Sequence, residues 1–127
     1  MIKLPKKGQE VSLEEIMNIC AVYNLNDLWY KIEQDPPKKP FKSDGCSGGW
    51  PDTWNEYNLY PACFIHDLKY WNGGDDVDRL IADAELMIDI VKITGDVGLA
   101  QIMFAGVRAG GGPHYKRSYS WNFGRND

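Results

Sequence analysis

The most informative stretch of this chain is Pro61-Ala-Cys-Phe-Ile-His66-Asp67-Leu-Lys-Tyr70. Read as a helix, it places four polar or reactive side chains at positions i, i+3, i+4 and i+7, which share one face: Cys63, His66, Asp67 and Tyr70. A thiol, a potential base, a carboxylate and a phenol then project together from a largely apolar helix. Because buried polar groups need partners, the pattern predicts either a polar network or a functional site.

The first third of the chain predicts two helices. Ser12-Leu-Glu-Glu15 is typical of a capping box, in which Ser12 starts a helix that continues to about residue 24. Asn26 or Asp27 is expected to cap a second, shorter helix. The Asp35-Pro-Pro sequence ends that helix, since proline disfavours helix both at its own position and at the residue before it.

Two longer helices are predicted to form the centre of the fold. Pro61 suits the first position of a helix that ends near residue 71. Asn72-Gly-Gly interrupts the chain, and Asp75 or Asp76 caps a helix that ends near residue 93. A connection of about four residues makes such helices antiparallel neighbours. Residues 41–60, rich in Gly, Pro, Asp and Asn, predict an ordered loop, and the fold class is therefore mainly α.

The second central helix has a periodic apolar stripe that is predicted to face the core: Val77, Leu80, Ile81, Ala84, Met87, Ile88 and Val91. On a helical wheel Asp83 falls at the edge of this stripe, whereas Glu85 and Asp89 fall on the opposite side. Asp83 is therefore the acid that the pattern points toward the core. Residues 97–108 are apolar nearly all round and predict a buried helix that Gly110 ends.

The length and charge of the chain restrict its class. Its 127 residues predict a single domain, 1–127, and a net charge of -4 argues against nucleic-acid binding. No apolar run approaches a transmembrane span. Lys3, Lys6 and Lys7 are not followed by an apolar segment, so no signal peptide is visible, which leaves a cytoplasmic location or another export route open.

The antiparallel arrangement allows His66 to face Asp83. A carboxylate bonded to one ring nitrogen fixes the tautomer and leaves the other nitrogen to accept a proton. No serine or cysteine is placed as a nucleophile, so such a base would activate water. Asp67 points about 100° away from His66 and, beside an Asp-Gly loop, suits Ca²⁺. The predicted chemistry is attack of water on an ester or an amide.

Four motifs resemble the secreted phospholipase A2 superfamily, most of all its small bacterial and fungal branch: Asp44-Gly-Cys-Ser, Pro51-Asp, Cys63-x-x-His-Asp-x-x-Tyr and Asp83-x-x-Leu-x-x-Asp. The resemblance covers about residues 41–90, within a motif-bearing core of about 41–94. It implies a phospholipase A2-like fold and calcium-dependent hydrolysis of the sn-2 ester of glycerophospholipids. His66 then matches the base, Asp83 the residue that orients it, and Tyr70 the tyrosine that bonds to this aspartate.

The resemblance also implies a calcium loop and a disulfide. Asp67 and Asp44 match carboxylate ligands of Ca²⁺, and Gly45 matches the ligand that gives its carbonyl. Cys46 and Cys63 match a family disulfide that ties the calcium loop to the active-site helix. Such an enzyme is secreted and works peripherally at a phospholipid membrane or micelle surface.

Alternatives remain beside this interpretation. The glycine-rich calcium loop of the animal enzymes and the second disulfide of the bacterial branch are both missing from the sequence. A phospholipase-like module that holds lipid or a protein without turnover is therefore the second hypothesis, and a helical interaction domain the third. Cys46 and Cys63 would stay thiols in a reducing cytosol, and Cys20 is expected in the core. The tail, His114 to Asp127, fits either packing over the core or contact with a bilayer.

Overall fold

Helices dominate the part of the chain that the computed structural model describes, residues 3–46 and 51–110. This part contains five helices: α1 (Leu13–Val22), α2 (Asn26–Gln34), α3 (Tyr60–Asn72), α4 (Asp76–Thr94) and α5 (Val97–Gly110). It also contains four strands of two residues each: β1 (Glu10–Val11), β2 (Phe41–Lys42), β3 (Thr53–Trp54) and β4 (Tyr57–Asn58). The mainly α fold class is confirmed.

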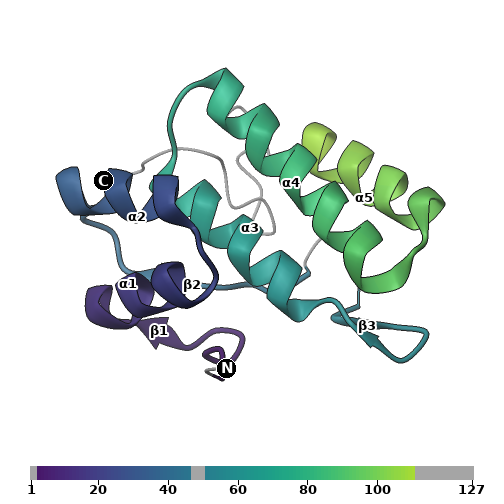
Figure 1. Ribbon diagram of the computed structural model, residues 1–127, viewed down its shortest axis with the longest axis horizontal. Coiled ribbons are helices and arrows are strands. Elements are labelled where there is room, and N and C mark those ends of the chain that lie inside the picture. The colour runs from purple at the N-terminus through teal and green to yellow at the C-terminus, as the bar shows by residue number, and fades with distance from the viewer. Residues whose placement is uncertain (1–2, 47–50, 111–127) are drawn as a thin grey trace.

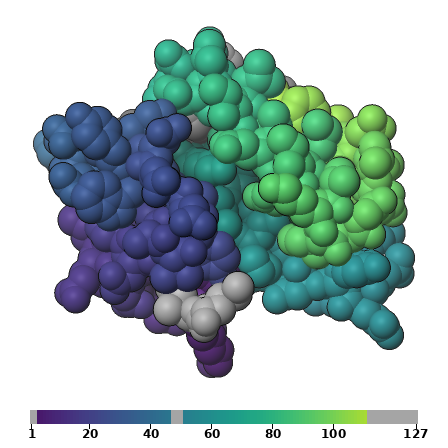
Figure 2. Space-filling model, viewed as in Figure 1, coloured from purple at the N-terminus to yellow at the C-terminus, as the bar shows by residue number. Residues whose placement is uncertain are grey.

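The helices are arranged around α3 (Figure 1). Helices α1 and α2 lie on one side of α3, and α4 lies on the other side with α5 packed against it. Helices α3 and α4 run antiparallel, as predicted, because only Gly73 to Asp75 connects them. The space-filling view shows α3 at the bottom of a furrow between the α2 side and the α4 side of the molecule (Figure 2).

Two antiparallel pairs of short strands fix the loops around these helices. Strand β1 pairs with β2, with Glu10 opposite Lys42 and Val11 opposite Phe41. Strand β3 pairs with β4 in a hairpin. The loop predicted for residues 41–60 therefore contains local strand pairing, which two-residue segments give no periodicity to reveal.

Most predicted helix starts are confirmed, and one is wrong. The Ser12 side chain accepts a hydrogen bond from the Glu15 amide, and Asp75 and Asp78 form a reciprocal capping box before α4. By contrast, Leu25 occupies the cap position of α2 and gives no side-chain hydrogen bond. Asn26 is already helical, so neither it nor Asp27 caps this helix.

Helix α4 presents a different face to the core from the one predicted. Its buried residues are Arg79, Ala82, Asp83, Leu86 and Ile90. Four members of the predicted stripe are instead 45–61% exposed: Val77, Leu80, Ile81 and Ile88. The helical period is right but its phase is wrong, because polar partners on α3 and α5 hold Asp83 inside. The inward direction of Asp83 is confirmed, and Glu85 is exposed as predicted, whereas Asp89 is half-buried.

Helix α5 is not the buried helix that its composition predicts. Only Leu99, Ala100 and Met103 of its residues are buried, while Val97 and Ile102 are more than half exposed. Among the described residues, the main packing partner of α5 is α4, which lies along one side of it (Figure 1). Within residues 3–46 and 51–110, no helix is both long and apolar enough to cross a membrane.

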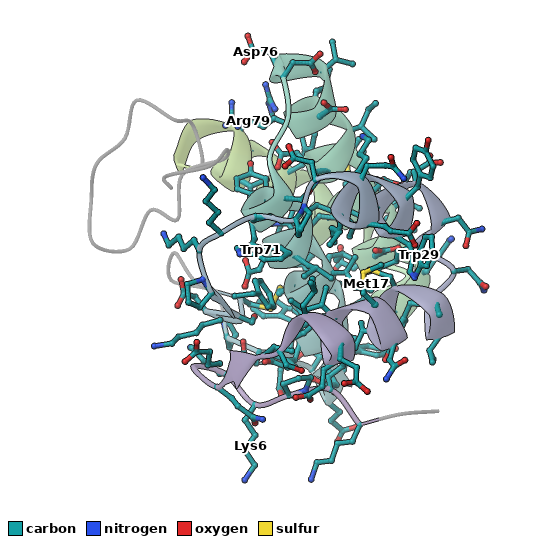
Figure 3. All side chains as sticks on the ribbon, turned by 90° about the vertical axis from the view of Figure 1, so that its left-hand side faces the viewer. Lys6, Met17, Trp29, Trp71, Asp76 and Arg79 are labelled. Atoms are coloured by element: carbon teal, nitrogen blue, oxygen red, sulfur yellow. A yellow bond between two sulfur atoms is a disulfide. The ribbon has the colours of Figure 1, made fainter. Side chains whose placement is uncertain are left out.

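Two apolar clusters pack on α3 from opposite sides. The first cluster consists of buried residues from β1, α1, α2, β2 and α3: Val11, Ile16, Ile19, Cys20, Leu28, Ile32, Phe41, Phe64 and Leu68. Met17, Trp29 and Trp71 cover its edge (Figure 3). The second cluster lies between α3, α4 and α5 and includes Leu86, Ile90 and Met103. Cys20 is a core residue, as predicted.

Candidate functional site

A histidine on α3 and an aspartate on α4 meet at the interface of these helices. His66 Nε2 lies 2.7 Å from Asp83 Oδ1, and the two residues are 3% and 0% exposed. The prediction that they face each other is confirmed. Because an ionised carboxylate only accepts hydrogen bonds, Nε2 carries the proton and Nδ1 is the basic nitrogen of the ring.

Tyr70 holds the same carboxylate from one turn farther along α3. Its hydroxyl donates to Asp83 Oδ1 at 2.6 Å, and its ring lies against the His66 ring with centroids 4.4 Å apart. Burial, and then the bond to Asp83, raise the pKa of Tyr70. The phenol therefore stays a donor, and the predicted hydrogen bond between Tyr70 and Asp83 is confirmed.

Two arginines complete the network, and sequence reasoning missed both. Arg108 Nη1 on α5 donates to Asp83 Oδ2 at 2.8 Å. Arg79 is one turn before Asp83 on α4, and its Nε donates to the Tyr70 hydroxyl at 3.3 Å. The i, i+4 spacing of Arg79 and Asp83 was a usable signal. Arg108 lies 25 residues from Asp83, so no local sequence pattern predicts the contact between them.

The charges of the pair follow from this environment. Burial would raise the pKa of Asp83, but the hydrogen bonds from His66, Tyr70 and Arg108 outweigh it and leave the pKa lowered. Burial lowers the pKa of His66, against the raising effect of Asp83. The arrangement therefore favours a neutral imidazole beside an ionised carboxylate, which is the resting state of a general base.

Asp67, the residue after His66, turns instead to the loop of residues 43–46. The Ser43 hydroxyl donates to Asp67 Oδ2 at 2.7 Å, and the Asp44 amide donates to the same oxygen at 3.0 Å. Asp67 is 6% exposed. Burial raises its pKa to about 8, and the negative charge of Asp44 adds to this effect. No motif in the sequence identifies Ser43 as a partner of Asp67.

The loop of residues 43–46 is held at further points. The Gly45 amide donates to the Ser43 hydroxyl at 3.0 Å, and the Cys46 amide donates to Asp52 Oδ1 at 2.8 Å. A disulfide joins Cys46 to Cys63, which confirms the predicted bridge. Cys63 lies one turn before His66, so the bridge ties this loop directly to the helix that carries the candidate base.

The donor set of this loop fits a hard cation. Among the residues whose positions are described, no three His, Cys, Asp or Glu side chains gather in a metal-binding arrangement. The predicted ligands are two carboxylates, Asp67 and Asp44, and the Gly45 carbonyl, all of them oxygen donors of the kind that Ca²⁺ takes. A cation beside Asp67 would also favour the ionised form of this carboxyl, which burial disfavours. Calcium binding remains a prediction.

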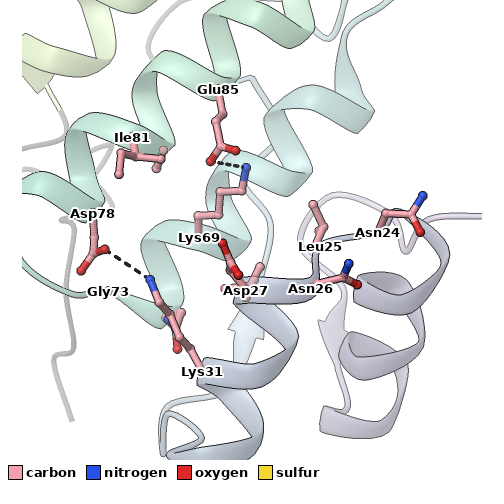
Figure 4. Close-up of a pocket in the computed structure, with 13 residues that line it drawn as sticks. Asn24, Leu25, Asn26, Asp27, Lys31, Lys69, Gly73, Asp78, Ile81 and Glu85 are labelled. Atoms are coloured by element: carbon pink, nitrogen blue, oxygen red, sulfur yellow. Dashed lines mark hydrogen bonds and ion pairs between the residues drawn. The ribbon is translucent and has the colours of Figure 1, made fainter.

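A cavity of about 230 Å³ occupies the furrow between α2, α3 and α4 (Figure 4). Two ion pairs between helices lie in its lining: Lys31 Nζ is 3.2 Å from Asp78 Oδ1, and Lys69 Nζ is 3.0 Å from Glu85 Oε1. Neither His66 nor Asp83 lines this cavity. The Lys31–Asp78 pair therefore connects the α2 and α4 sides of the furrow, the Lys69–Glu85 pair joins α3 to α4, and neither pair belongs to the His66 site.

The chain matches no protein-family model, no curated protein and no solved structure. The resemblance to phospholipases A2 accordingly rests on the sequence motifs of residues 41–90. His114 and the aromatic tail lie outside the described residues, and the predictions for them stay predictions.

Proposed function

We propose that this protein is a calcium-dependent ester hydrolase that releases the sn-2 fatty acid of glycerophospholipids at a membrane or micelle surface. The observation that carries the proposal is the buried contact of 2.7 Å between His66 Nε2 and Asp83 Oδ1. This contact assigns the imidazole tautomer and gives it a carboxylate partner, which are the two requirements of a water-activating base.

In this proposal His66 Nδ1 removes a proton from water while the water oxygen attacks the ester carbonyl. Asp83 stabilises the imidazolium that forms, and Tyr70 keeps Asp83 in place through its hydroxyl. The imidazolium then returns its proton to the departing alkoxide, so that the products are a fatty acid and a lysophospholipid. The base is regenerated neutral, as burial favours.

The residues proposed to hold calcium are Asp67, Asp44 and the carbonyl of Gly45. When bound, Ca²⁺ supplies positive charge for the substrate phosphate and for the developing oxyanion. Ser43 contributes by fixing Asp67 Oδ2, and the Cys46–Cys63 bridge holds the loop against α3. A disulfide at this position is in keeping with a secreted protein, because such bonds persist in oxidising compartments.

The test is fatty-acid release from mixed phospholipid vesicles, with calcium and with a chelator. We expect release with calcium and little with chelator; equal release in both would remove calcium from the mechanism. His66→Gln should lower kcat by roughly 100-fold or more, the usual contribution of a general base. Lys92→Gln, which changes one exposed residue of α4, is the control. Undiminished activity of His66→Gln would refute the base assignment.

Two observations favour the second candidate function, a lipid- or protein-binding module without turnover. His66 is 3% exposed, and one oxygen of Asp67 already accepts two hydrogen bonds from the loop. Calorimetric titration with calcium separates the two functions. An enzyme is expected to bind calcium more tightly when lipid is present, whereas an inert module is expected to show no such site.

A further inference from the structure

We propose that Arg108 is a positioning residue for Asp83, so that the last turn of α5 belongs to the site. This inference rests on the proposed function, because it assigns Arg108 a part in the same reaction. Arg108 acts through Asp83 and does not itself meet the reacting atoms.

The two oxygens of Asp83 are held from different helices. Oδ1 accepts from His66 Nε2 at 2.7 Å and from the Tyr70 hydroxyl at 2.6 Å, both on α3. Oδ2 accepts from Arg108 Nη1 on α5 at 2.8 Å. A carboxylate fixed at both ends cannot rotate about its side-chain bonds. The direction in which Oδ1 meets the imidazole therefore depends on what holds Oδ2.

In the described part of the chain, no other side chain that we find is placed to donate a hydrogen bond to Asp83 Oδ2. Arg79 Nε lies 4.0 Å from Asp83 Oδ2, which is too far for a hydrogen bond. Asp83 is 0% exposed, so loss of the Arg108 bond would leave the buried Oδ2 without a hydrogen bond from Arg108, and Arg79 lies beyond hydrogen-bond distance. Without Arg108, we expect the carboxylate to turn toward Arg79 and to lose its alignment with His66.

Arg79 contacts α5 rather than Asp83 Oδ2, and its hydrogen bonds hold the last turn of α5 against α4. Its Nη2 donates to the carbonyl oxygens of Val107 and Arg108 at 3.0 and 2.6 Å. These carbonyls belong to the last turn of α5, where helical partners run out and a cation is favourable. Figure 3 shows Arg79 near the start of α4, beside α5. Arg108 is thus attached to α4 twice, by its backbone to Arg79 and by its side chain to Asp83.

The experiment compares Arg108→Gln, Arg108→Lys and the control Lys92→Gln in the full chain. Circular dichroism and thermal unfolding establish that each variant is folded. We expect Arg108→Gln to lower kcat for fatty-acid release by about 10- to 100-fold, the scale of a small misplacement of a catalytic group. KM should change little, and Arg108→Lys should restore a large part of kcat. A purely structural anchor would lower the melting temperature and leave the kcat of the folded protein unchanged.

A second readout does not depend on hydrolysis. In protein with ¹⁵N-labelled histidine, the Nε2 proton of His66 should give a downfield resonance, because it is hydrogen-bonded and protected. We expect this resonance in the wild type and in Lys92→Gln, and its loss or shift in Arg108→Gln. A folded Arg108→Gln with the resonance and kcat both unchanged would overturn the positioning role. A wild type that shows the resonance but no hydrolysis would refute the enzyme and not the contact.

Discussion

Breaking the disulfide between Cys46 and Cys63 should cost the protein about 3 kcal/mol of unfolding free energy. The two cysteines are 17 residues apart. Closing a loop of that length removes about 10 cal/mol/K from the entropy of the unfolded chain, or about 3 kcal/mol at 25 °C in the chain-entropy model. Reduced thiols occupy nearly the same space as the bridge, so the loss on reduction should stay close to this value.

The assay is urea unfolding followed by tryptophan fluorescence, with and without a reductant. A slope of roughly 2 kcal/mol per molar urea would turn the loss into a shift of about 1.5 M in the unfolding midpoint. The double variant Cys46→Ser/Cys63→Ser should resemble the reduced protein and should not respond to reductant. Cys20 is present in every sample, so any effect of reductant on it appears in the variant as well.

The reasoning would be refuted by a loss below about 1 kcal/mol on reduction, since the chain-entropy term would then be absent. A large effect of reductant on the double variant would also refute it, because the change would then arise at another group. The same samples can be titrated with calcium. The bridge holds the loop of residues 43–46 against α3, so the reduced protein should bind calcium more weakly if that loop supplies the ligands.

Two further predictions concern the core. Ile90→Ala should destabilise the protein by about 2–5 kcal/mol, because Ile90 is 0% exposed. Ile88→Ala on the same helix should change stability by less than about 1 kcal/mol, because Ile88 is 48% exposed. Equal losses of unfolding free energy in chemical denaturation would mean that α4 does not bury the face that contains Ile90. Burial raises the pKa of the Cys20 thiol to about 11 from about 9 in the unfolded chain. The unfolded state therefore loses its proton first, so stability should fall as pH rises from about 9 to 11, and Cys20→Ala should remove that part of the fall.

The sequence predicted the central helix pair and the polar contacts across it because these are local or short-range features. Capping residues, a short Gly-containing connection and a spacing of 17 residues place His66 against Asp83 with little freedom. The Cys46–Cys63 bridge came from the family resemblance, and the structure contains it. These features depend on residues that are close in sequence or that belong to the same recognisable motif.

The features that could not be predicted depend on contacts distant in sequence. The face that α4 buries places Asp83 against Arg108, His66 and Tyr70 and buries Ala82, Leu86 and Ile90 beside it, and none of these partners outside α4 is visible in the periodicity of the helix. Composition suggested that α5 is buried, but only Leu99, Ala100 and Met103 of this helix pack into the cluster between α3, α4 and α5. Ser43 carries no signal of its own, because a serine in a Gly- and Asp-rich loop is ordinary until the position of Asp67 is known.

The loop that precedes Cys46 also restricts how this chain can diverge. Gly45 has a φ of +66°, and a Cβ there would lie 2.7 Å from Asp52 Oδ1, so substitution meets both backbone strain and a collision. Gly8 has a φ of +80° but open space around it, and an asparagine could replace it. Replacement of Gly8 should therefore cost the fold less than replacement of Gly45, which would also disturb the loop that the Cys46–Cys63 bridge holds against α3.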